Sequence, residues 1–362
     1  MLERTTTFVI GAGASHDFEF PLGDLLRDRI ISVLNIDDPN RSINFSDPSV
    51  STIVQDRAAK DGGNVEWLSR IEVYRNAATI IRNGLPFARS IDTFVDGLRD
   101  DQQIRFLAKL AIALVILRAE TGSPLGLGTN PRFEPPHLRD EKLQKLRSSW
   151  HVELSQILFD GHTAATLDSV FENASFIVFN YDRCLEEFLT ISLMRRFNIE
   201  RARALALVGK CSIIHPYGQV GAFQPDEDGF LAFGQFQDYQ VTAAASRIRT
   251  FTESMESDVA AGIKELIAQA EVLAFMGFGW LPQNMQLLRV EGRRTTARRV
   301  YATMKDMEQG EIDVVINQIN HILNRDEDDP FYDDMVDYPL EFIIDRGDCK
   351  ALMQNCWLRL TS

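Results

Sequence analysis

Short apolar runs that end in a polar or glycine-rich turn recur along much of the chain. The first run, Thr5 to Ile10, is rich in β-branched and apolar residues and leads directly into Gly-Ala-Gly, a pattern that predicts a buried strand followed by a tight turn. From Leu22 to Leu34 the apolar residues recur near helical spacing instead. A buried strand followed by such a helix is typical of a parallel α/β unit.

The pattern changes over residues 35–164, where helical periodicity replaces the strand signal. We interpret this segment as a mainly helical insertion within a single domain that covers residues 1–362. Its predicted elements are a polar, turn-rich start over Asn35–Pro48, helices over 50–120 with the strongest pattern over Ile104–Leu117, a loop over Thr121–Pro136, and a helix over Asp140–Phe159.

The alternation of strands and helices returns after this segment. Strands are predicted over Phe176–Phe179, Cys211–Ile214, Phe230–Phe233, Val272–Met276, Arg299–Met304 and Leu340–Ile344. Helices are predicted over Cys184–Arg196, Ser257–Ala270, Met307–Leu323 and Lys350–Leu360. An acidic stretch between Asp326 and Asp337 is interpreted as a solvated loop. The pattern therefore predicts an α/β fold: a Rossmann-like parallel sheet with helices on both faces and a large helical insertion.

Composition narrows the class of protein. The 362 residues are 45% hydrophobic and 25% charged, which indicates a globular chain with a substantial core. The net charge of −14 disfavours a broad nucleic-acid surface, so we expect no direct nucleic-acid binding. The four cysteines are scattered without C-x-x-C spacing, which favours reduced thiols over a disulfide framework or a zinc module. Without a signal-peptide pattern, and with its longest apolar run only at Leu110–Leu117, the chain is expected to be soluble, cytoplasmic and free of the membrane.

The glycine turn after the first predicted strand is a candidate nucleotide site. In Gly11-Ala12-Gly13 the glycines leave room for a ligand near the backbone, and the start of a following helix favours phosphate through its N–H groups and its dipole. The third glycine of the dinucleotide-binding pattern G-x-G-x-x-G is replaced by His16. By itself the turn supports nucleotide binding and a plain structural turn about equally.

Three later strand ends carry residues suited to the same site. They are Asn180-Tyr181-Asp182, the segment from His215 to Gly218, and Gly277-Phe278-Gly279, each after a short apolar run. Ligands of open parallel sheets bind beyond the carboxyl ends of the strands. The four turns are therefore expected to meet in one crevice.

This ordered set of motifs resembles the sirtuin family, and more closely its bacterial NAD⁺-hydrolysing branch of antiphage defence effectors. The matching segments, which together span nearly the whole chain, are Gly11-Ala12-Gly13-Ala14-Ser15, Phe20-Pro21-Leu22-Gly23, Asn180-Tyr181-Asp182, His215 with Gly218, and Gly277-Phe278-Gly279. Two features depart from the family pattern. The cysteine-ligated zinc module of sirtuin deacylases is absent, and Pro216 and Tyr217 interrupt the family's His-Gly pair.

The resemblance implies NAD⁺ as the substrate, no metal, and distinct roles for these residues. Asn180 would be catalytic by holding the ribose or the attacking water, and His215 would be catalytic as a base near neutral pH. The residues that would bind NAD⁺ are Gly11, Ala12, Gly13, Ala14, Ser15, Asp182, Gly277, Phe278 and Gly279. Each has a structural alternative: Asp182 suits a helix cap equally well, and His215 suits a satisfied side chain at a strand end. Asp92 lies in a helical context and is interpreted as structural.

The reaction expected from the resemblance is cleavage of the nicotinamide–ribose bond of NAD⁺, through an oxocarbenium-like transition state, to give ADP-ribose and nicotinamide. The resemblance also implies NAD⁺ depletion in abortive antiphage defence. Such an enzyme needs gating, so we expect a homo-oligomer and a protein partner, by analogy a HerA-type hexameric ATPase. Two alternatives remain open: an NAD⁺-dependent deacylase or ADP-ribosyltransferase, and a catalytically silent module that binds NAD⁺ or ADP-ribose.

Overall fold

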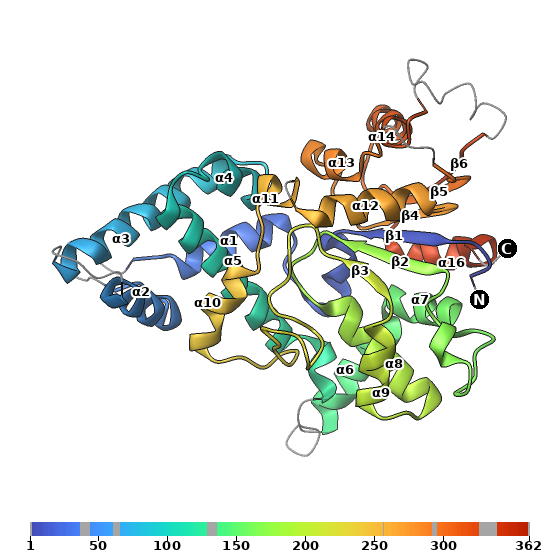
Figure 1. The fold of residues 1–362 in the computed structure, drawn as a ribbon, viewed down its shortest axis with the longest axis horizontal. Helices are drawn as coiled ribbons and strands as arrows, with labels where there is room; N and C mark the ends of the chain where they lie inside the picture. The colour runs from blue at the N-terminus through green and yellow to red at the C-terminus, as the bar shows by residue number, and fades with distance from the viewer. Residues whose placement is uncertain are drawn as a thin grey trace.

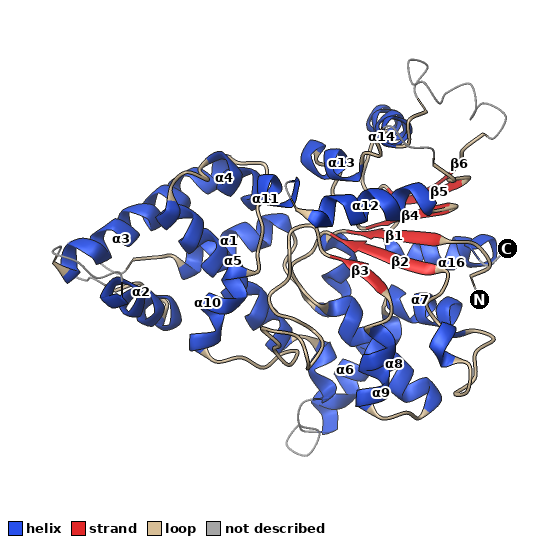
Figure 2. Ribbon diagram, in the orientation of Figure 1, coloured by secondary structure: helices blue, strands red, loops and turns tan. Residues whose placement is uncertain are grey.

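A six-stranded sheet forms the centre of the computed structural model, which describes residues 2–36, 44–60, 66–128, 136–255, 257–291, 295–325 and 339–360. Its strands are β1 (Thr6–Ile10), β2 (Ala174–Val178), β3 (Ser212–Ile214), β4 (Val272–Met276), β5 (Arg299–Thr303) and β6 (Glu341–Asp345). They lie in the order β3-β2-β1-β4-β5-β6, and all neighbours are parallel (Figures 1 and 2). This is the strand order of the dinucleotide-binding doubly wound fold. The predicted α/β, Rossmann-like class is confirmed.

The central strands form because they are short apolar runs covered on both faces. Every residue of β1, β2 and β4 is buried, whereas the edge strands β3 and β6 are partly exposed. Val9 of β1 packs into the core on one face of the sheet, and Phe8 and Ile10 pack into the core on the other. β1 therefore lies at the middle of the sheet, with its carboxyl end flanked by the ends of β2 and β4.

Helices cover both faces of the sheet, as predicted (Figure 2). On the face that receives Val9, the core is completed by α12 (Asp258–Gln269), α13 (Pro282–Leu288) and α14 (Gln309–Ile322). On the face that receives Phe8, it is completed by α7 (Trp150–Phe159), α8 (Cys184–Phe197), α9 (Arg201–Val208) and α16 (Cys349–Leu360).

A second group of helices, which we call the helical lobe, stands at the end of the sheet where the strands finish (Figure 1). It consists of α1 (Gly23–Val33), α2 (Pro48–Lys60), α3 (Trp67–Gly84), α4 (Ile91–Gly97), α5 (Gln102–Gly122), α10 (Asp238–Ser246) and α11 (Phe251–Met255). α5 is largely buried and packs against α1, α3, α4 and α10. The remaining elements are α6 (Pro136–Ser148) and the 3₁₀ helices η1 (Ala12–Phe18), η2 (Leu85–Phe87), η3 (Pro124–Gly128) and η4 (Leu167–Ser169).

The division into one domain with an insertion over residues 35–164 stays a prediction. α10 and α11 lie later in the chain and pack in the lobe, whereas α7 packs against α8 and α16 beside the sheet. Several boundaries differ from the predicted ones. The helix predicted over Asp140–Phe159 is interrupted at Ser149, whose backbone is extended, with ψ of 151°. Among the α-helices of the described residues, α9, α10, α11 and α13 were not predicted. The acidic stretch Asp326–Asp337 lies outside the described residues.

The prediction of a strand over Phe230–Phe233 is wrong. Phe230 makes an isolated bridge, and the segment has no place in the sheet. Gly229 and Gly234 flank it with φ of 74° and 71°, which turns the backbone away from an extended path at both ends. Its Leu231 carbonyl accepts a hydrogen bond from Arg183, so the apolar run encloses a buried guanidinium instead of extending the sheet.

The cysteines of the chain, Cys184, Cys211, Cys349 and Cys356, are all free and buried. Burial raises the pKa of the Cys184 thiol well above its usual range, with the Asp182 carboxylate acting in the same direction. These cysteines therefore behave as small core residues. Along the part of the chain that the structure describes, no helix combines the length and the apolar character that a membrane span requires.

A buried ion pair connects the lobe to the sheet. Arg183, in the turn after β2, donates through Nε to Oε1 of Glu120 at 3.0 Å and through Nη2 to the other carboxylate oxygen. Its Nη1 donates to the carbonyls of Ala222 and Leu231. Neither charged side chain is exposed to solvent, and Glu120 belongs to the last turn of α5. The pair thus fixes the end of α5 against the turn that follows β2.

Glu120→Gln is expected to lower the free energy of unfolding by about 3–5 kcal/mol, because Arg183 is then buried without a carboxylate partner. Chemical denaturation measures this change. The matched control is Asp168→Asn, which removes an exposed carboxylate paired with Arg203 and Lys210 and should leave stability close to wild type. A Glu120→Gln protein as stable as its control would contradict the structural importance of the pair.

Candidate functional site

A cavity of about 330 Å³ lies where the carboxyl ends of β1, β2 and β4 meet the helical lobe. The chain passes from β1 to β2 and β3 on one side, and β4 to β6 lie on the other, so the strand order reverses between β1 and β4. In open α/β sheets this reversal point is the ordinary ligand crevice. The sheet side contributes Gly11–Gly13, Phe179–Asp182, Tyr217 and Gly277–Gly279 to the wall, and the lobe side contributes Phe20–Asp24, Leu26, Arg89–Asp92 and Ile116.

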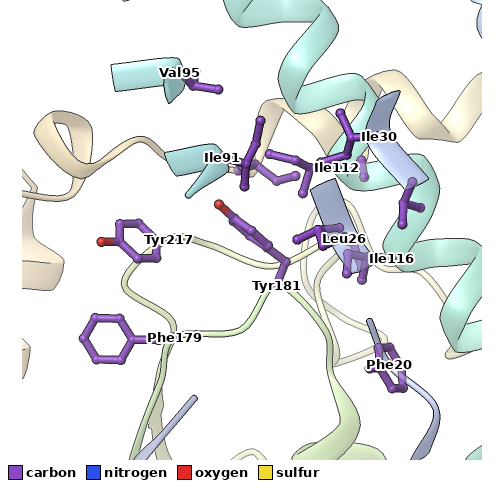
Figure 3. Close-up of a cluster of buried hydrophobic side chains, with 14 of the residues drawn as sticks. Phe20, Leu26, Ile30, Ile91, Val95, Ile112, Ile116, Phe179, Tyr181 and Tyr217 are labelled. Atoms are coloured by element: carbon purple, nitrogen blue, oxygen red, sulfur yellow. The ribbon is translucent and has the colours of Figure 1, made fainter. Parts of the chain in front are cut away.

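Aromatic and branched side chains form the apolar part of this wall. Figure 3 shows Tyr181 extending from the turn after β2 towards Ile91 of the lobe, with Tyr217 and Phe179 beside it. The rings of Phe179 and Tyr217 meet edge to face with centroids 5.8 Å apart. Phe278, in the turn after β4, lies 5.0 Å from Phe179 in the same manner. The cavity therefore combines flat apolar surfaces with polar turns.

The glycine turns after β1 and β4 pack directly against each other. Gly11 N donates to Met276 O and Gly13 N donates to Gly277 O, both at 3.0 Å. A Cβ on Gly11 would lie 2.5 Å from the Gly277 carbonyl oxygen, and a Cβ on Gly277 would lie 2.3 Å from Ala14 N. Gly277 also has φ of +56°, which L side chains rarely adopt. These glycines are required first by the contact between the two turns.

The amides left over from this contact are those of Ala12, Phe278 and Gly279. Within the described residues none of these N–H groups donates a hydrogen bond, and all three residues line the cavity. A Cβ on Gly279 would meet nothing within 4 Å, so this glycine leaves open space beside the backbone. Unpaired amides on two adjacent turns are suited to binding an anion.

Ala14 and Ser15, predicted as ligand contacts, lie behind the cavity wall. Ala14 is buried, and its carbonyl accepts a hydrogen bond from Trp150 Nε1 at 2.8 Å. Ser15 is 3% exposed and supports Asn180 instead. Gly11, Ala12, Gly13, Asp182, Gly277, Phe278 and Gly279 are the predicted contacts that do line the cavity.

Asn180 is held by a short hydrogen-bond chain. Its Nδ2 donates to Gly11 O at 3.1 Å and to Ser15 Oγ at 2.8 Å, and Ser15 Oγ donates to Asp182 Oδ1 at 3.1 Å. The Gly11 carbonyl can only accept, which assigns the amide orientation. Oδ1 of Asn180 accepts no hydrogen bond from the described residues, and Asn180 lines the cavity. An acceptor is thus presented at a fixed place.

Asp182 supports Asn180 through Ser15 and also accepts a hydrogen bond at the start of α8. Its Oδ1 accepts the amide of Cys184, the first residue of α8, at 3.1 Å. Burial raises the pKa of Asp182 to about 6 against the opposing hydrogen bonds from Cys184. A direct contact with a ligand is open to it as well, because Asp182 lines the cavity.

His215 lies behind Asn180 and is not among the residues that line the cavity. Its Nδ1 is 3.0 Å from the Asn180 carbonyl oxygen, and its Nε2 is 2.9 Å from Oε1 of Glu186 in α8. A carbonyl only accepts, and an ionised carboxylate does too, so both ring nitrogens donate when His215 is an imidazolium. Burial lowers the pKa of His215, but the Glu186 carboxylate outweighs it and the net shift is upward. In the imidazolium form, both ring nitrogens of His215 are engaged, Nδ1 with the Asn180 carbonyl and Nε2 with Glu186.

Asp92, interpreted as structural from the sequence, is an ionisable residue that lines the cavity. It lies in the first turn of α4, lines the cavity from the lobe side, and accepts a hydrogen bond from the Tyr181 hydroxyl. Burial raises the pKa of Asp92 to about 6, against the opposing Tyr181 hydrogen bond. Asp92 follows the N-cap residue Ser90 by two positions, which is an ordinary pattern at the start of a helix. The sequence therefore does not show that tertiary packing brings Asp92 to the same cavity as Asn180.

Hydrogen bonds also join the lobe to the turn after β4. Thr93 Oγ1 donates to Gln283 Oε1 at 2.8 Å, and Gln283 Nε2 donates to the Tyr217 hydroxyl at 3.3 Å. Tyr217 in turn donates to Asn284 Oδ1 at 2.7 Å, and Asn284 Nδ2 donates to Gly279 O at 3.0 Å. Tyr217, which interrupts the expected His-Gly pair, therefore connects the two sides of the cavity.

Comparison with protein-family models, with curated proteins and with solved structures gives no match for this chain. Among the described residues, no group of three or more His, Cys, Asp or Glu side chains gathers in a way that could hold a metal ion. The strand order and the cavity at its reversal point define a Rossmann-like α/β protein with a candidate ligand site.

Gly277→Ala is expected to reduce the free energy of unfolding by about 2–4 kcal/mol, because the new Cβ overlaps Ala14 N and φ is positive. Gly23→Ala, where a Cβ meets nothing within 4 Å, is the matched control. Urea denaturation of both variants checks the difference. Equal stability of the two proteins would show that the turns after β1 and β4 do not need their close contact.

Proposed function

We propose that the protein hydrolyses NAD⁺ in this cavity to ADP-ribose and nicotinamide. The observation that carries the proposal is the convergence of three kinds of group on one cavity at the strand-order reversal. These are the unpaired amides of Ala12, Phe278 and Gly279, the unpaired acceptor of Asn180, and the carboxyl group of Asp92. The amides suit the anionic pyrophosphate of NAD⁺, and the Asn180 acceptor suits a ribose hydroxyl. The carboxyl group of Asp92 is suited to proton transfer.

The binding mode that we propose follows from these chemistries. The pyrophosphate lies against the amides of the two turns, where backbone N–H groups favour negative charge. Asn180 Oδ1 accepts a hydrogen bond from a ribose hydroxyl. The aromatic wall formed by Phe179, Tyr181 and Tyr217 supports the flat nicotinamide ring, since stacked or edge-on contacts are favourable there.

The chemical step breaks the bond between ribose C1′ and the nicotinamide nitrogen and forms a bond between C1′ and a water oxygen. Nicotinamide leaves with the electron pair of the broken bond, and the water loses a proton. Asp92 accepts that proton in our proposal, because its carboxylate lines the cavity and its pKa of about 6 keeps it ionised at neutral pH. Asn180 stabilises the oxocarbenium-like ribose, and His215 acts as a positioning residue behind it.

A second candidate function is nucleotide binding without turnover. The buried His215–Glu186 pair favours it, because the imidazole expected as a base has both nitrogens engaged. Product analysis separates the remaining reactions: free ADP-ribose supports hydrolysis, whereas O-acyl-ADP-ribose or an ADP-ribosylated protein indicates transfer. The antiphage role, a homo-oligomer and a HerA-type ATPase partner belong to the same proposal, because unregulated hydrolysis would deplete the NAD⁺ of the producing cell.

The wild-type protein is expected to release nicotinamide from NAD⁺, and Asn180→Ala is expected to lower kcat/KM by about 100-fold or more, since the ribose loses its acceptor. Chromatographic product assays, with and without a candidate ATPase partner, measure the turnover. Asn355→Ala, on the exposed face of α16, is the matched control. Nucleotide binding without products in every condition would replace this proposal with the binding module.

Asp92→Asn is expected to lower kcat/KM by roughly 100-fold or more, because a general base contributes that much. In the wild type, kcat/KM should rise with pH through about 6 as Asp92 ionises, and fall above the raised pKa of His215 as the imidazolium is lost. The contribution of Asp92 to the acid limb should disappear in Asp92→Asn, and what remains of the limb belongs to Asp182, whose pKa is also about 6. Asp24→Asn, an exposed carboxylate at the cavity mouth, is the control. A wild-type rate in a folded Asp92→Asn protein would exclude Asp92 as the base.

A further inference from the structure

Arg89 is the basic side chain among the described residues that line the cavity. It is exposed, and the structure gives it no ion pair or hydrogen bond within the described chain. Neighbouring arginines of the lobe differ: Arg27 pairs with Asp24, and Arg75 pairs with Glu72. Arg89 therefore presents an unused guanidinium at the edge of the cavity.

The backbone on both sides of Arg89 is anchored. The carbonyl of Ala88 accepts a hydrogen bond from Arg27 Nη2 at 3.4 Å. Ser90 caps α4, its side chain accepting the amide of Thr93 at 3.1 Å. The position of the Arg89 backbone is thus set by α1 and α4, while its side chain remains available to a ligand.

The rest of the charge in the cavity wall is negative. Asp24, Asp92 and Asp182 line the same cavity, and the whole chain has a net charge of −14. A phosphate-bearing ligand would enter against this field unless a cation opposes it. The unpaired amides of Ala12 and Gly279 supply only partial charges. A full positive charge at the wall comes from Arg89.

We propose that Arg89, together with the unpaired amides of Ala12, Phe278 and Gly279, forms the site that recognises the pyrophosphate of a nucleotide. The inference rests on the proposed function, because the nucleotide is taken to occupy this cavity. The guanidinium fork binds phosphate oxygens from the lobe side, and the amides bind them from the sheet side. The ligand class is therefore nucleoside diphosphates and their sugar esters, such as ADP-ribose, and nucleosides without phosphate bind weakly.

The test is isothermal titration of ADP-ribose, ADP and adenosine into the wild type, Arg89→Gln and Arg89→Lys. Arg82→Gln, on the last turn of α3 and outside the cavity wall, is the matched control. Arg89→Gln should weaken ADP-ribose and ADP at least about 10-fold and leave adenosine unchanged. Arg89→Lys should lie between, because an ammonium keeps the charge and loses the fork. Higher salt should weaken ADP-ribose binding more in the wild type than in Arg89→Gln.

The outcomes separate this inference from the proposed reaction. ADP-ribose affinity in Arg89→Gln within about twofold of the control, or an equal loss for adenosine, would overturn the role of Arg89 while leaving NAD⁺ hydrolysis intact. Binding of ADP-ribose that depends on Arg89, in a protein that never turns over NAD⁺, would support the phosphate site and reject the hydrolysis. A wild type that binds none of the three ligands would reject both.

Discussion

The contact between the turns after β1 and β4 is the constraint from which the candidate site follows. The sheet brings the two strands side by side, and their turns then meet backbone to backbone through Gly11, Gly13 and Gly277. The amides of Gly11 and Gly13 donate to Met276 O and Gly277 O, and the amide of Gly277 donates to Thr303 Oγ1. Because their amides are used and their Cβ-free faces are in contact, these glycines leave little for a ligand. The contact instead fixes the direction of the remaining amides, those of Ala12, Phe278 and Gly279, at the cavity wall. The close contact between the two turns therefore holds these three N–H donors in fixed positions.

A second network fixes the acceptor. Asn180 is held from one side by Gly11 and Ser15, and from behind by the His215–Glu186 pair. Charge-assisted hydrogen bonds in a buried setting are strong and hold their geometry. In the proposed reaction, His215 orients Asn180, and proton transfer belongs to Asp92 on the lobe side of the cavity. The structure places Asp92 in contact with Tyr181, the residue next to Asn180 in the chain.

Much of the fold could be predicted because β1 and β4 are compact apolar runs that end in glycine turns, a pattern with few other structural solutions. Phe230–Phe233 has the same apolar character, yet it encloses Arg183, whose partner Glu120 lies far away in the sequence. Asn180 and Asp182 could be placed because they follow a strand directly. The contacts that His215 makes with Glu186, and Asp92 with Tyr181, could not be predicted, because they arise from tertiary packing that no local sequence pattern carries.

The polar groups of the cavity come from two parts of the protein, the sheet side and the helical lobe. The sheet side contributes the amides, Asn180 and the carboxyl group of Asp182, which backbone and side-chain hydrogen bonds hold in place. The lobe contributes the charged side chains of Asp92 and Arg89. Their distance from the sheet depends on the position of the lobe relative to the sheet. The buried Arg183–Glu120 ion pair and the hydrogen bonds from Thr93 through Gln283 to Tyr217 hold the lobe in this position. Because these contacts cross between the lobe and the sheet, a rotation of the lobe would have to break them before it separated Asp92 and Arg89 from the amides of the sheet side.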